Sequence, residues 1–329
     1  MVKIMGIFDV KPHVVSRTLK GYSVMLYGDP KSGKTTTATR FPKHLLLAFE
    51  KGYSAIPGAM ALPVNSWGEF LKYLRELKKP EAHDTYETII VDTADIAWDY
   101  CEQYVCAQNN VDKINQIPYG GGHAQLKKEF DKQLRSIVQM GYGLVLISHS
   151  VAKPFMDPRT GVEYDRMVPT LPNGARIIVN RLCDIIGYST TEFDDEGRTI
   201  TKLKMRGTPR YDAGSRFTYT PDEIVFNYDN LVNAIGDAID KQAQALGQTE
   251  LFTDSGQSAH VGTVVEYNFD ELMADFNNHV NRLMTANVSN QPKIAEIVER
   301  HLGIGNKVAE MSRNQAEVLA TIVDELTTL

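Results

Sequence analysis

Residues Gly28 to Thr35, GDPKSGKT, have the types and the spacing of a loop that binds phosphate. Such a loop aims backbone amides at phosphate oxygens, and Gly28 and Gly33 allow the backbone angles that this needs. Lys34 supplies a mobile cation for the β- and γ-phosphates, and the Thr35 hydroxyl is a ligand for Mg²⁺. We therefore predict that the chain binds ATP and Mg²⁺. The expected nucleotide contacts are Gly28, Asp29, Pro30, Lys31, Ser32, Gly33, Lys34, Thr35 and Thr36.

The segments on either side of this loop match what a phosphate loop needs. The β-prone run YSVMLY at 22–27 leads directly into it. The run KTTTATRF at 34–41 then begins as a helix, whose positive N-terminal end would face the anion. The alternative is a Gly/Ser turn with a solvated lysine, and the flanking strand and helix favour the phosphate loop.

Two carboxylates stand where hydrolysis of ATP would need them. Asp92 ends the apolar run TIIVD, so its carboxylate would face the metal ion beside Thr35. The alternative is a cap for the helix that starts near Asp95, although Asp95 is the better candidate for that cap. Glu50 ends the buried run LLLAFE at the edge of the sheet where ligands bind, and would orient the attacking water. Its alternative is an exposed glutamate at a strand end.

His149 ends another apolar run, LVLISH, at the same edge of the sheet. A polar group there would contact the γ-phosphate and signal its presence to the chain that follows. The alternative is a histidine bonded only to backbone. Lys34, Glu50, Asp92 and His149 are thus the candidate catalytic residues, and Thr35 and Asp92 are the candidate metal ligands.

The elements that position these residues alternate between strands and helices. Strand-like runs at 43–50, 86–92 and 143–150 follow the first strand, and amphipathic patterns predict helices at 66–79 and 123–140. Such alternation indicates strands that lie parallel, with helices on both faces of the sheet. The sequence therefore predicts an α/β fold with a mostly parallel sheet flanked by helices.

Changes in composition along the sequence predict the domain boundaries. Residues 1–240 are expected to form the core, which closes with a hairpin at 192–207 and a helix. The stretch 241–265 is polar and small, which is typical of a linker. Residues 266–329 return to helical periodicity and predict a small, acidic C-terminal helical region.

Bulk properties exclude several classes of protein. The 329 residues are 43% hydrophobic and 23% charged, which is enough for a large buried core. We find no run of 18 apolar residues, no secretory signal and no metal-ligand spacing among the three cysteines, so we expect a cytoplasmic protein without a membrane partner. The net charge is −6, but residues 237–329 hold 14 acidic and 6 basic residues, so the remainder is close to neutral.

Three further segments have unusual compositions: two predicted loops and one strand that carries three cations. Residues 151–174 are rich in Pro, Gly, Asp and Arg without clear periodicity, which predicts a long loop, and such loops in compact domains are often functional. The run PYGGG at 118–122 predicts a flexible loop. The run TKLKMRG places Lys202, Lys204 and Arg206 on one face of a strand, which is unfavourable unless something anionic lies opposite. The alternative is a solvated strand face.

Taken in order, these motifs resemble a known family. GDPKSGKTT, LLLAFEKG, TIIVDTAD and GLVLISHS, followed by YGGGHAQLKKEFDKQL and TKLKMRGTPRYDAGSRF, are similar to the RecA-like core of phage ATPases. These are the small RecA-related recombination proteins of tailed phages, grouped by sequence with AAA-type P-loop proteins. The resemblance covers roughly residues 20–236, and it depends on the order and spacing of the motifs more than on each motif.

The resemblance implies roles for several residues. Glu50 matches the acidic residue that activates water in RecA-like enzymes, and His149 matches the polar sensor, which is Gln in RecA itself. Lys204 and Arg206 fall where these proteins place cations that reach the nucleotide of the next subunit. Hydrolysis would then depend on a homo-oligomer, because a neighbour would stabilise charge on the transferred phosphoryl group.

The resemblance also implies a path for single-stranded DNA, because the segment that matches residues 151–174 contacts DNA in RecA-like filaments. Cations with interspersed aromatics suit base stacking and phosphate contact. Acidic neighbours cancel that charge locally, and the alternative is a disordered surface loop. The groups concerned are Lys153, Phe155, Arg159, Tyr164 and Arg166 against Asp157, Glu163 and Asp165. Tyr119 and Gly120–Gly122 would belong to a second DNA-facing loop.

These expectations lead to one favoured function and two rivals. The favoured function is an ATP- and Mg²⁺-dependent phage protein that acts on single-stranded DNA in recombination or annealing. The second is a replication accessory ATPase that loads a helicase or remodels a protein complex. Its acidic C-terminal region would bind a helicase or a single-strand-binding protein, or would be a plain helical cap. The third is a nucleotide kinase, which needs an arginine-rich lid that we do not recognise in the sequence.

Overall fold

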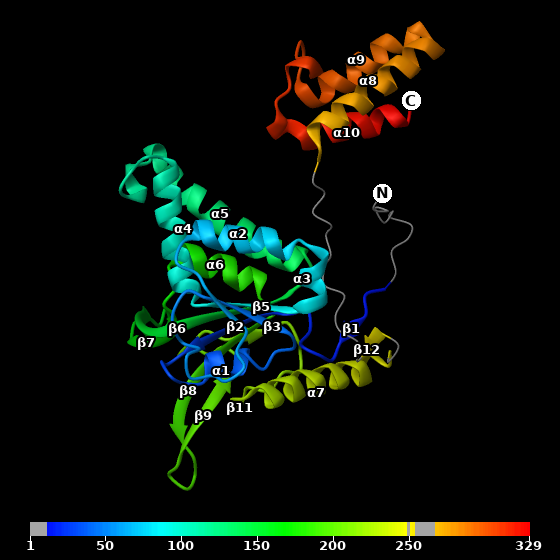
Figure 1. Cartoon of the computed structure of the whole chain (residues 1–329). Coiled ribbons are helices and arrows are strands. Elements are labelled where there is room, and N and C mark those ends of the chain that lie inside the picture. The colour runs from blue at the N-terminus through cyan, green and yellow to red at the C-terminus, as the bar shows by residue number, and fades with distance from the viewer. Residues whose placement is uncertain (1–11, 249–250, 254–266) are drawn as a thin grey trace. The chain divides into compact units, whose positions relative to one another are not determined.

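The computed structural model describes residues 12–248, 251–253 and 267–329 (Figure 1). The chain divides into two compact units, Met1–Thr263 and Val264–Leu329, and each is described by itself. None of the described helices combines the length and the apolar content needed to cross a membrane.

Ten of the described strands of the first unit form one sheet. In chain order these are β2 (Ser23–Gly28), β3 (His44–Ala48), β4 (Ala61–Pro63), β5 (Thr88–Asp92), β6 (Gly143–Met156), β7 (Glu163–Pro169), β8 (Ile185–Phe193), β9 (Thr199–Lys204), β10 (Gly214–Ser215) and β11 (Glu223–Val225). A separate parallel pair joins β1 (Val15–Ser16) to β12 (Phe252–Thr253).

The sheet is mostly parallel, as the sequence predicts. Its order is β11-β9-β8-β2-β6-β5-β3-β4, and the strands from β8 to β4 run parallel to their neighbours. Strands β7, β9, β10 and β11 add antiparallel pairs. The chain leaves β2 for β3, returns through β5 and β6, and then crosses to β8 on the other side of β2. A ligand crevice is expected where the direction of winding changes, at the carboxyl ends of the strands.

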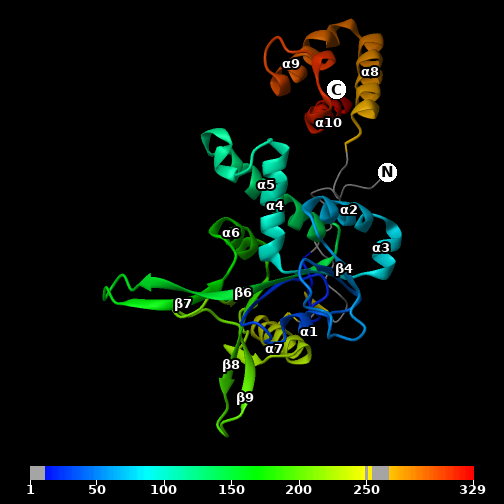
Figure 2. The ribbon, with the colours of Figure 1, turned by 60° about the vertical axis from the view of Figure 1, so that its left-hand side comes forward.

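Helices cover both faces of the sheet (Figures 1 and 2). The bounds are α1 (Lys34–Ala38), α2 (Trp67–Leu77), α3 (Pro80–Thr85), α4 (Ala94–Gln108), α5 (Gly121–Gln139), α6 (Asn173–Leu182) and α7 (Tyr228–Leu246). One core contains side chains of α2, α4, α5 and α6, and the other contains side chains of α1 and α7. Strands β2 and β5 are buried at every residue, and burial on both faces of the sheet accounts for their runs of apolar side chains.

A local signal in the sequence explains where α2 begins. The Ser66 hydroxyl accepts a hydrogen bond from the backbone N–H of Glu69, which caps α2 as its sequence predicts. The PYGGG segment differs from the predicted flexible loop. Pro118–Gly120 form a 3-10 turn and Gly121 already begins α5.

Two β-hairpins project from the sheet (Figure 2). The β8–β9 hairpin confirms the one predicted from the sequence. The prediction of a loop at 151–174 is wrong, because β6 continues to Met156 and pairs with β7 before α6 begins at Asn173. Two parts of the predicted linker at 241–265 have regular structure: residues 241–246 are the end of α7, and Phe252–Thr253 form β12. The rest of the predicted linker, apart from residues 247, 248 and 251, lies outside the described residues.

The second unit is helical, as the sequence predicts. Its helices are α8 (Phe269–Ala286), α9 (Gln291–Leu302) and α10 (Ala316–Thr327). They share a core of their own, which includes Leu283, Ile294, Ile297, Leu319, Ile322 and Leu326. All the described residues of this core belong to the second unit.

Candidate functional site

The phosphate-loop segment sits at the C-terminal end of β2 and is held against β8. A Cβ atom on Gly28 would lie 2.0 Å from the carbonyl oxygen of Ser189, so only glycine fits this approach. The Ser32 and Ser189 hydroxyls are 2.7 Å apart, and both side chains are buried. The predicted contact residue Ser32 therefore anchors the loop to the sheet with its side chain.

Lys34 folds back onto the loop that precedes it. Its ammonium donates hydrogen bonds to the carbonyl oxygens of Gly28 (3.0 Å) and Asp29 (2.7 Å), and the side chain is 5% exposed. Burial lowers the pKa of Lys34, and the carboxylates of Asp92 and Asp29 oppose that shift. The cation is thus already close to the loop that would cradle the phosphates.

The side chains of Thr35 and Asp92, which the sequence predicts to be metal ligands, are in contact with each other. The Thr35 hydroxyl donates to Asp92 Oδ2 over 2.7 Å, although the two residues are 57 positions apart. Burial raises the pKa of Asp92 to about 6, against the hydrogen bond from Thr35. An alcohol and a carboxylate are hard oxygen donors of the kind that Mg²⁺ prefers, so these residues fit the ion.

Gly52 is a member of this site that the sequence analysis missed. A Cβ atom on Gly52 would lie 3.3 Å from both Asp92 Oδ2 and Thr35 Oγ1. The absence of a side chain keeps space free beside the two candidate metal ligands. Only its position two residues after Glu50 could have drawn attention to it.

Glu50 and His149 lie together beside this pair. His149 is in register with Gly28 across the β2–β6 ladder, and its Nε2 is 3.6 Å from Glu50 Oε2. The carbonyl oxygen of Asp92 accepts hydrogen bonds from the amides of Phe49 (2.7 Å) and Glu50 (3.1 Å), which fixes the chain after β3. The side chains of Glu50 and His149 remain about one-third exposed, so a ligand can reach them.

Asp95 does not cap α4, contrary to the expectation from sequence. The N-cap is Thr93, and Asp95 lies inside the first turn. Its Oδ1 accepts hydrogen bonds from the Ser148 hydroxyl (3.0 Å) and the Thr170 hydroxyl (2.5 Å). Burial raises the pKa of Asp95, and these two hydrogen bonds oppose that shift.

The structure does not bring Lys204 and Arg206 to the residues around Lys34, and both are engaged by their own chain. Lys202 and Lys204 each form ion pairs with Glu192 and Glu223. Hydrogen bonds from these two lysines lower the pKa of Glu223. The anionic groups required opposite the lysines are therefore glutamates of the same sheet edge.

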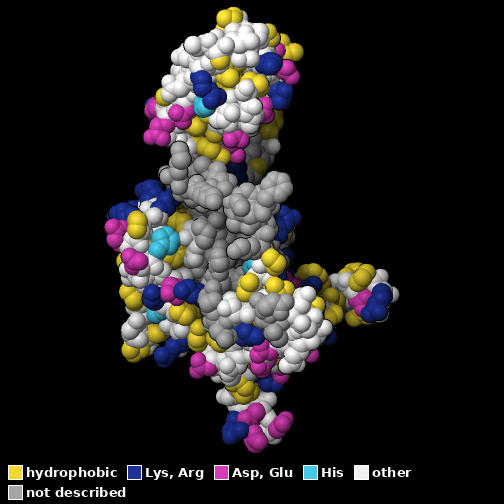
Figure 3. All heavy atoms as spheres, turned by 90° about the vertical axis from the view of Figure 1, so that its right-hand side faces the viewer, with side chains coloured by type: hydrophobic (Ala, Val, Ile, Leu, Met, Phe, Trp, Pro, Cys, Tyr) yellow, Lys and Arg dark blue, Asp and Glu magenta, His cyan; other side chains and the backbone are white. Residues whose placement is uncertain are grey.

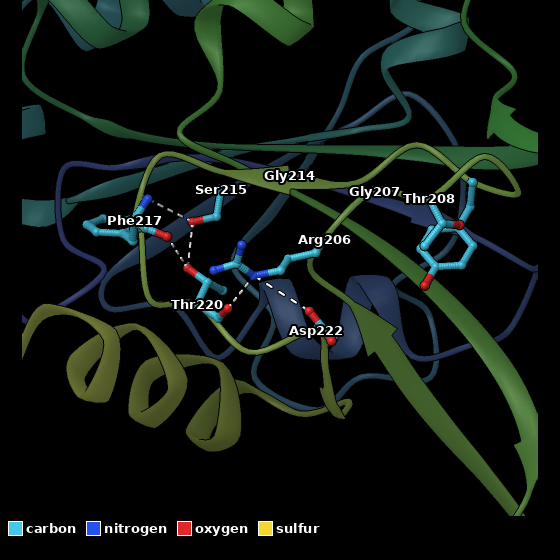
Figure 4. A pocket seen from close by; sticks show the side chains of 9 residues that line it. Arg206, Gly207, Thr208, Gly214, Ser215, Phe217, Thr220 and Asp222 are labelled. Carbon is cyan, nitrogen blue, oxygen red and sulfur yellow. Dashed lines mark hydrogen bonds and ion pairs between the residues drawn. The ribbon is translucent and has the colours of Figure 1, made fainter. Parts of the chain in front are cut away.

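Arg206 lines a cavity of about 460 Å³ at the end of β9 (Figure 4). Its Nε donates to the carbonyl oxygen of Thr220 over 2.6 Å, and its terminal nitrogen donates to that of Thr218. Asp222 lies 3.6 Å from the Nε atom. Figure 4 shows the guanidinium between Thr220 and Asp222, which also line the cavity.

The β6–β7 hairpin sorts its charges between two faces. Lys153 is paired with Arg166 and Phe155 with Tyr164, so these four side chains share one face. The Phe155 and Tyr164 rings are 6.4 Å apart, and the Arg166 guanidinium lies 5.4 Å from the Phe155 ring centre. Arg210, from the chain after β9, lies 5.6 Å from the ring of Tyr164.

Two of the three acidic residues that were expected to cancel this charge lie elsewhere, whereas Asp157 forms an ion pair with Arg159, as expected. Glu163 and Asp165 are paired with Met156 and Pro154 on the opposite face of the hairpin. Arg166 does form an ion pair with Asp212. In the second predicted DNA-facing segment, Tyr119 is fully exposed, immediately before α5.

Comparison with known proteins agrees with this architecture. Residues 20–217 match the family described as AAA domain. The chain is 32% identical over 343 aligned residues to the SPbeta prophage-derived protein YorG of Bacillus subtilis (strain 168), with 97% of each chain covered. A likeness to the flagellar accessory protein FlaH from Methanocaldococcus jannaschii covers 63% of this chain and 85% of that one, at 12% identity. Its TM-score of 0.32 supports no conclusion. The chain belongs to the AAA-domain family of P-loop ATPases.

Proposed function

We propose that the chain is a Mg²⁺-dependent ATPase of phage origin that acts on single-stranded DNA in recombination or annealing, in the cytoplasm of a bacterial host. The observation that carries the ATPase is the convergence of five side chains at the carboxyl ends of parallel strands: Lys34, Glu50, Thr35, Asp92 and His149. The prophage-derived relative supports the phage origin.

In the proposed reaction, Lys34 exchanges the carbonyl oxygens of the loop for the β- and γ-phosphates. Thr35 and Asp92 would hold Mg²⁺, which neutralises charge on the phosphate oxygens when it is bound. Glu50, kept in place by the Asp92 backbone, orients the water for in-line attack on the γ-phosphorus. His149, beside Glu50, responds to the presence of the γ-phosphate.

The β6–β7 hairpin is the proposed contact for single-stranded DNA. Its chain follows His149 directly, so loss of the γ-phosphate would loosen DNA through the same strand. Support comes from the face that holds Lys153, Phe155, Tyr164 and Arg166 together. Aromatic rings stack on bases and cations contact the phosphates between them, whatever the base sequence.

Assembly into a homo-oligomer is also part of the proposal. Lys204 and Arg206 would then offer their charge to the nucleotide of the next subunit. Glu192, Glu223 and backbone carbonyl groups hold these cations in the single chain, so assembly would have to exchange those partners. ATPase activity per subunit should accordingly rise with protein concentration.

The test is ATPase activity with and without single-stranded DNA. Lys34→Ala should abolish nucleotide binding, and Glu50→Gln should retain binding while lowering kcat by about 100-fold or more. DNA should stimulate the wild-type enzyme. If DNA neither binds at low salt nor stimulates hydrolysis, the recombination proposal fails. If Lys34→Ala leaves affinity and turnover unchanged, the ATPase proposal fails as well.

The second candidate, a replication accessory ATPase, is favoured by the separate helical unit with its own core. It predicts a tight complex with a helicase through residues 267–329 and little direct affinity for DNA. Removal of that unit should then abolish the complex while ATPase activity of the first unit persists. A single-strand-binding protein is the other partner to be assayed in the same way.

A further inference from the structure

Three consecutive residues of β6 contact three different parts of the candidate nucleotide site. The Ser148 hydroxyl donates to Asp95 over 3.0 Å. His149 lies beside the proposed water-orienting carboxylate, at 3.6 Å. The Ser150 hydroxyl donates to Asp29 of the phosphate loop over 3.0 Å. The strand that becomes the projecting hairpin is therefore joined to the site at each successive residue.

Asp95 joins both strands of the hairpin at its base. The same oxygen, Oδ1, accepts the hydroxyls of Ser148 on β6 and of Thr170, the residue after β7. Those hydroxyls also lie 3.2 Å and 3.4 Å from the carbonyl oxygen of His149, to which the Thr170 amide donates over 3.0 Å. Asp95 follows the candidate metal ligand Asp92 by three residues. The Asp95 carboxylate therefore links the segment that carries this ligand to the hairpin.

The hairpin does not need these contacts in order to form. Its backbone ladder continues from Ser150–Pro169 to Met156–Glu163, which fixes the register by itself. Thr170 is exposed, so its hydroxyl is not required to satisfy a buried core. The contacts made by Asp95 therefore add a connection between elements that are already folded.

We propose that Asp95 is a positioning residue that couples the nucleotide site to the β6–β7 hairpin. It holds Ser148 and Thr170 so that the backbone of His149 and both strands of the hairpin move as one body. The inference rests on the proposed function, because it takes ATP as the ligand that moves His149. It names a residue that the phosphate chemistry alone does not require.

The test is amide hydrogen exchange of the full chain with and without a non-hydrolysable ATP analogue and Mg²⁺. In the wild-type protein, the analogue should slow exchange both in residues 28–35 and in the hairpin, 151–168. Thr170→Val keeps the shape of the side chain and removes its hydroxyl. This variant should keep the protection of 28–35 and lose at least half of the hairpin response.

Three further variants separate coupling from a merely structural effect. Asp95→Ala should lose the hairpin response, and Asp95→Asn should retain most of it, since the amide oxygen can still accept both hydroxyls. Thr191→Val is the matched control, because its hydroxyl pairs with Thr201 on the other hairpin. It should respond as the wild-type protein does.

The outcomes distinguish failure of nucleotide binding from failure of the coupling. If the analogue fails to protect residues 28–35 of the wild-type protein, nucleotide binding and the coupling both fail. If those residues are protected but the hairpin does not respond, only the coupling fails. The same conclusion follows if Thr170→Val and Asp95→Ala both respond like the wild-type protein.

Discussion

The β6–β7 and β8–β9 hairpins project from one sheet on either side of β2, and both carry cations (Figure 2). They differ in what lies beside those cations. On β6–β7, Lys153 and Arg166 share a face with two aromatic rings, and Glu163 and Asp165 lie on the opposite face. The carboxylate that pairs with Arg166 is Asp212, which comes from outside this hairpin. On β8–β9 and the neighbouring β11, lysines and glutamates share one face and pair with each other.

The difference shows that the net charge of a segment does not identify its partner. The pleat of the strand decides whether acidic and basic side chains meet or are separated. The cations of β8–β9 already have carboxylates, and acidic and basic side chains lie next to one another at the tip of this hairpin, the lowest part of the view in Figure 3. This difference is the reason that we propose the aromatic face of β6–β7, and not β8–β9, as the contact for single-stranded DNA.

The largest expected effect concerns the aromatic pair on β6–β7. Phe155→Ala and Tyr164→Ala should each weaken binding of single-stranded DNA by about 5- to 150-fold, because stacking contributes about 1–3 kcal/mol per base. Fluorescence anisotropy with a labelled oligothymidine at fixed salt measures the affinity. ATPase activity without DNA should stay within about twofold of the wild-type value, since neither ring touches the nucleotide site.

The other hairpin supplies the matched control for this experiment. Phe193 is 76% exposed at the end of β8, and Phe193→Ala removes an equally large ring there. It should leave DNA affinity unchanged. Equal losses from Phe193→Ala and Phe155→Ala would abolish the distinction between the hairpins.

The sequence could not predict the β6–β7 hairpin because neither of its faces is apolar. Residues 153–156 and 163–166 do alternate, but between cations with aromatics on one face and acids with Met and Pro on the other. Hydrophobic periodicity carries no signal in such a strand. The β8–β9 hairpin was predictable, since its turn DDEG and its alternating second strand are both local features.

The same distinction applies to the candidate site. Lys34 and Thr35 follow from a local motif, and Asp92, Glu50 and His149 from their places at the ends of apolar strands. Gly52 and the contacts of Asp95 depend on approaches between segments that are distant in the chain. Such contacts cannot be predicted from a sequence until it is known which residues of neighbouring strands pair with each other.

A change of pH tests the site between the hairpins. The pKa of Asp92 is raised from 3.8 to about 6 by burial, so the protein without ligand holds this carboxyl protonated below that pH. Affinity for the Mg²⁺–nucleotide complex should therefore fall as pH drops below about 6, approaching tenfold per pH unit, because binding must release the proton of Asp92. The free energy of unfolding should change in the opposite direction. It should fall as pH rises from about 4 to 6, because Asp92 ionises in the unfolded chain at a lower pH than in the folded protein.

Calorimetric titration of the nucleotide with Mg²⁺ between pH 5 and 7.5 measures this dependence. Asp92→Asn should bind weakly at every pH and show little of the slope. The nucleotide response of β6–β7 should disappear at low pH together with binding. An unchanged affinity across the range would show that Asp92 does not take part in binding the metal.

Removal of Lys204 tests whether the other hairpin uses its cations internally. Lys204→Met leaves Glu192 and Glu223 with less compensation and should lower the free energy of unfolding by about 1–2 kcal/mol, discounted because both glutamates are partly exposed. Urea denaturation measures the loss, and Lys202→Met, at a more exposed lysine, should cost less. Unchanged stability with a large loss of ATPase activity only in concentrated protein would instead assign Lys204 to a neighbouring nucleotide.

The smallest effect expected is on the salt dependence of DNA binding. Each phosphate contact on a single strand contributes about 0.7 to the slope of log affinity against log salt concentration. Lys153→Gln should therefore reduce the slope by about 0.7, because Lys153 shares its face with the aromatic pair. Lys202→Gln should leave it unchanged, since Lys202 is paired with Glu192 and Glu223. Equal changes from both variants would mean that a polyanion draws Lys202 away from its glutamates, and that ion pairing within the chain does not decide which hairpin binds DNA.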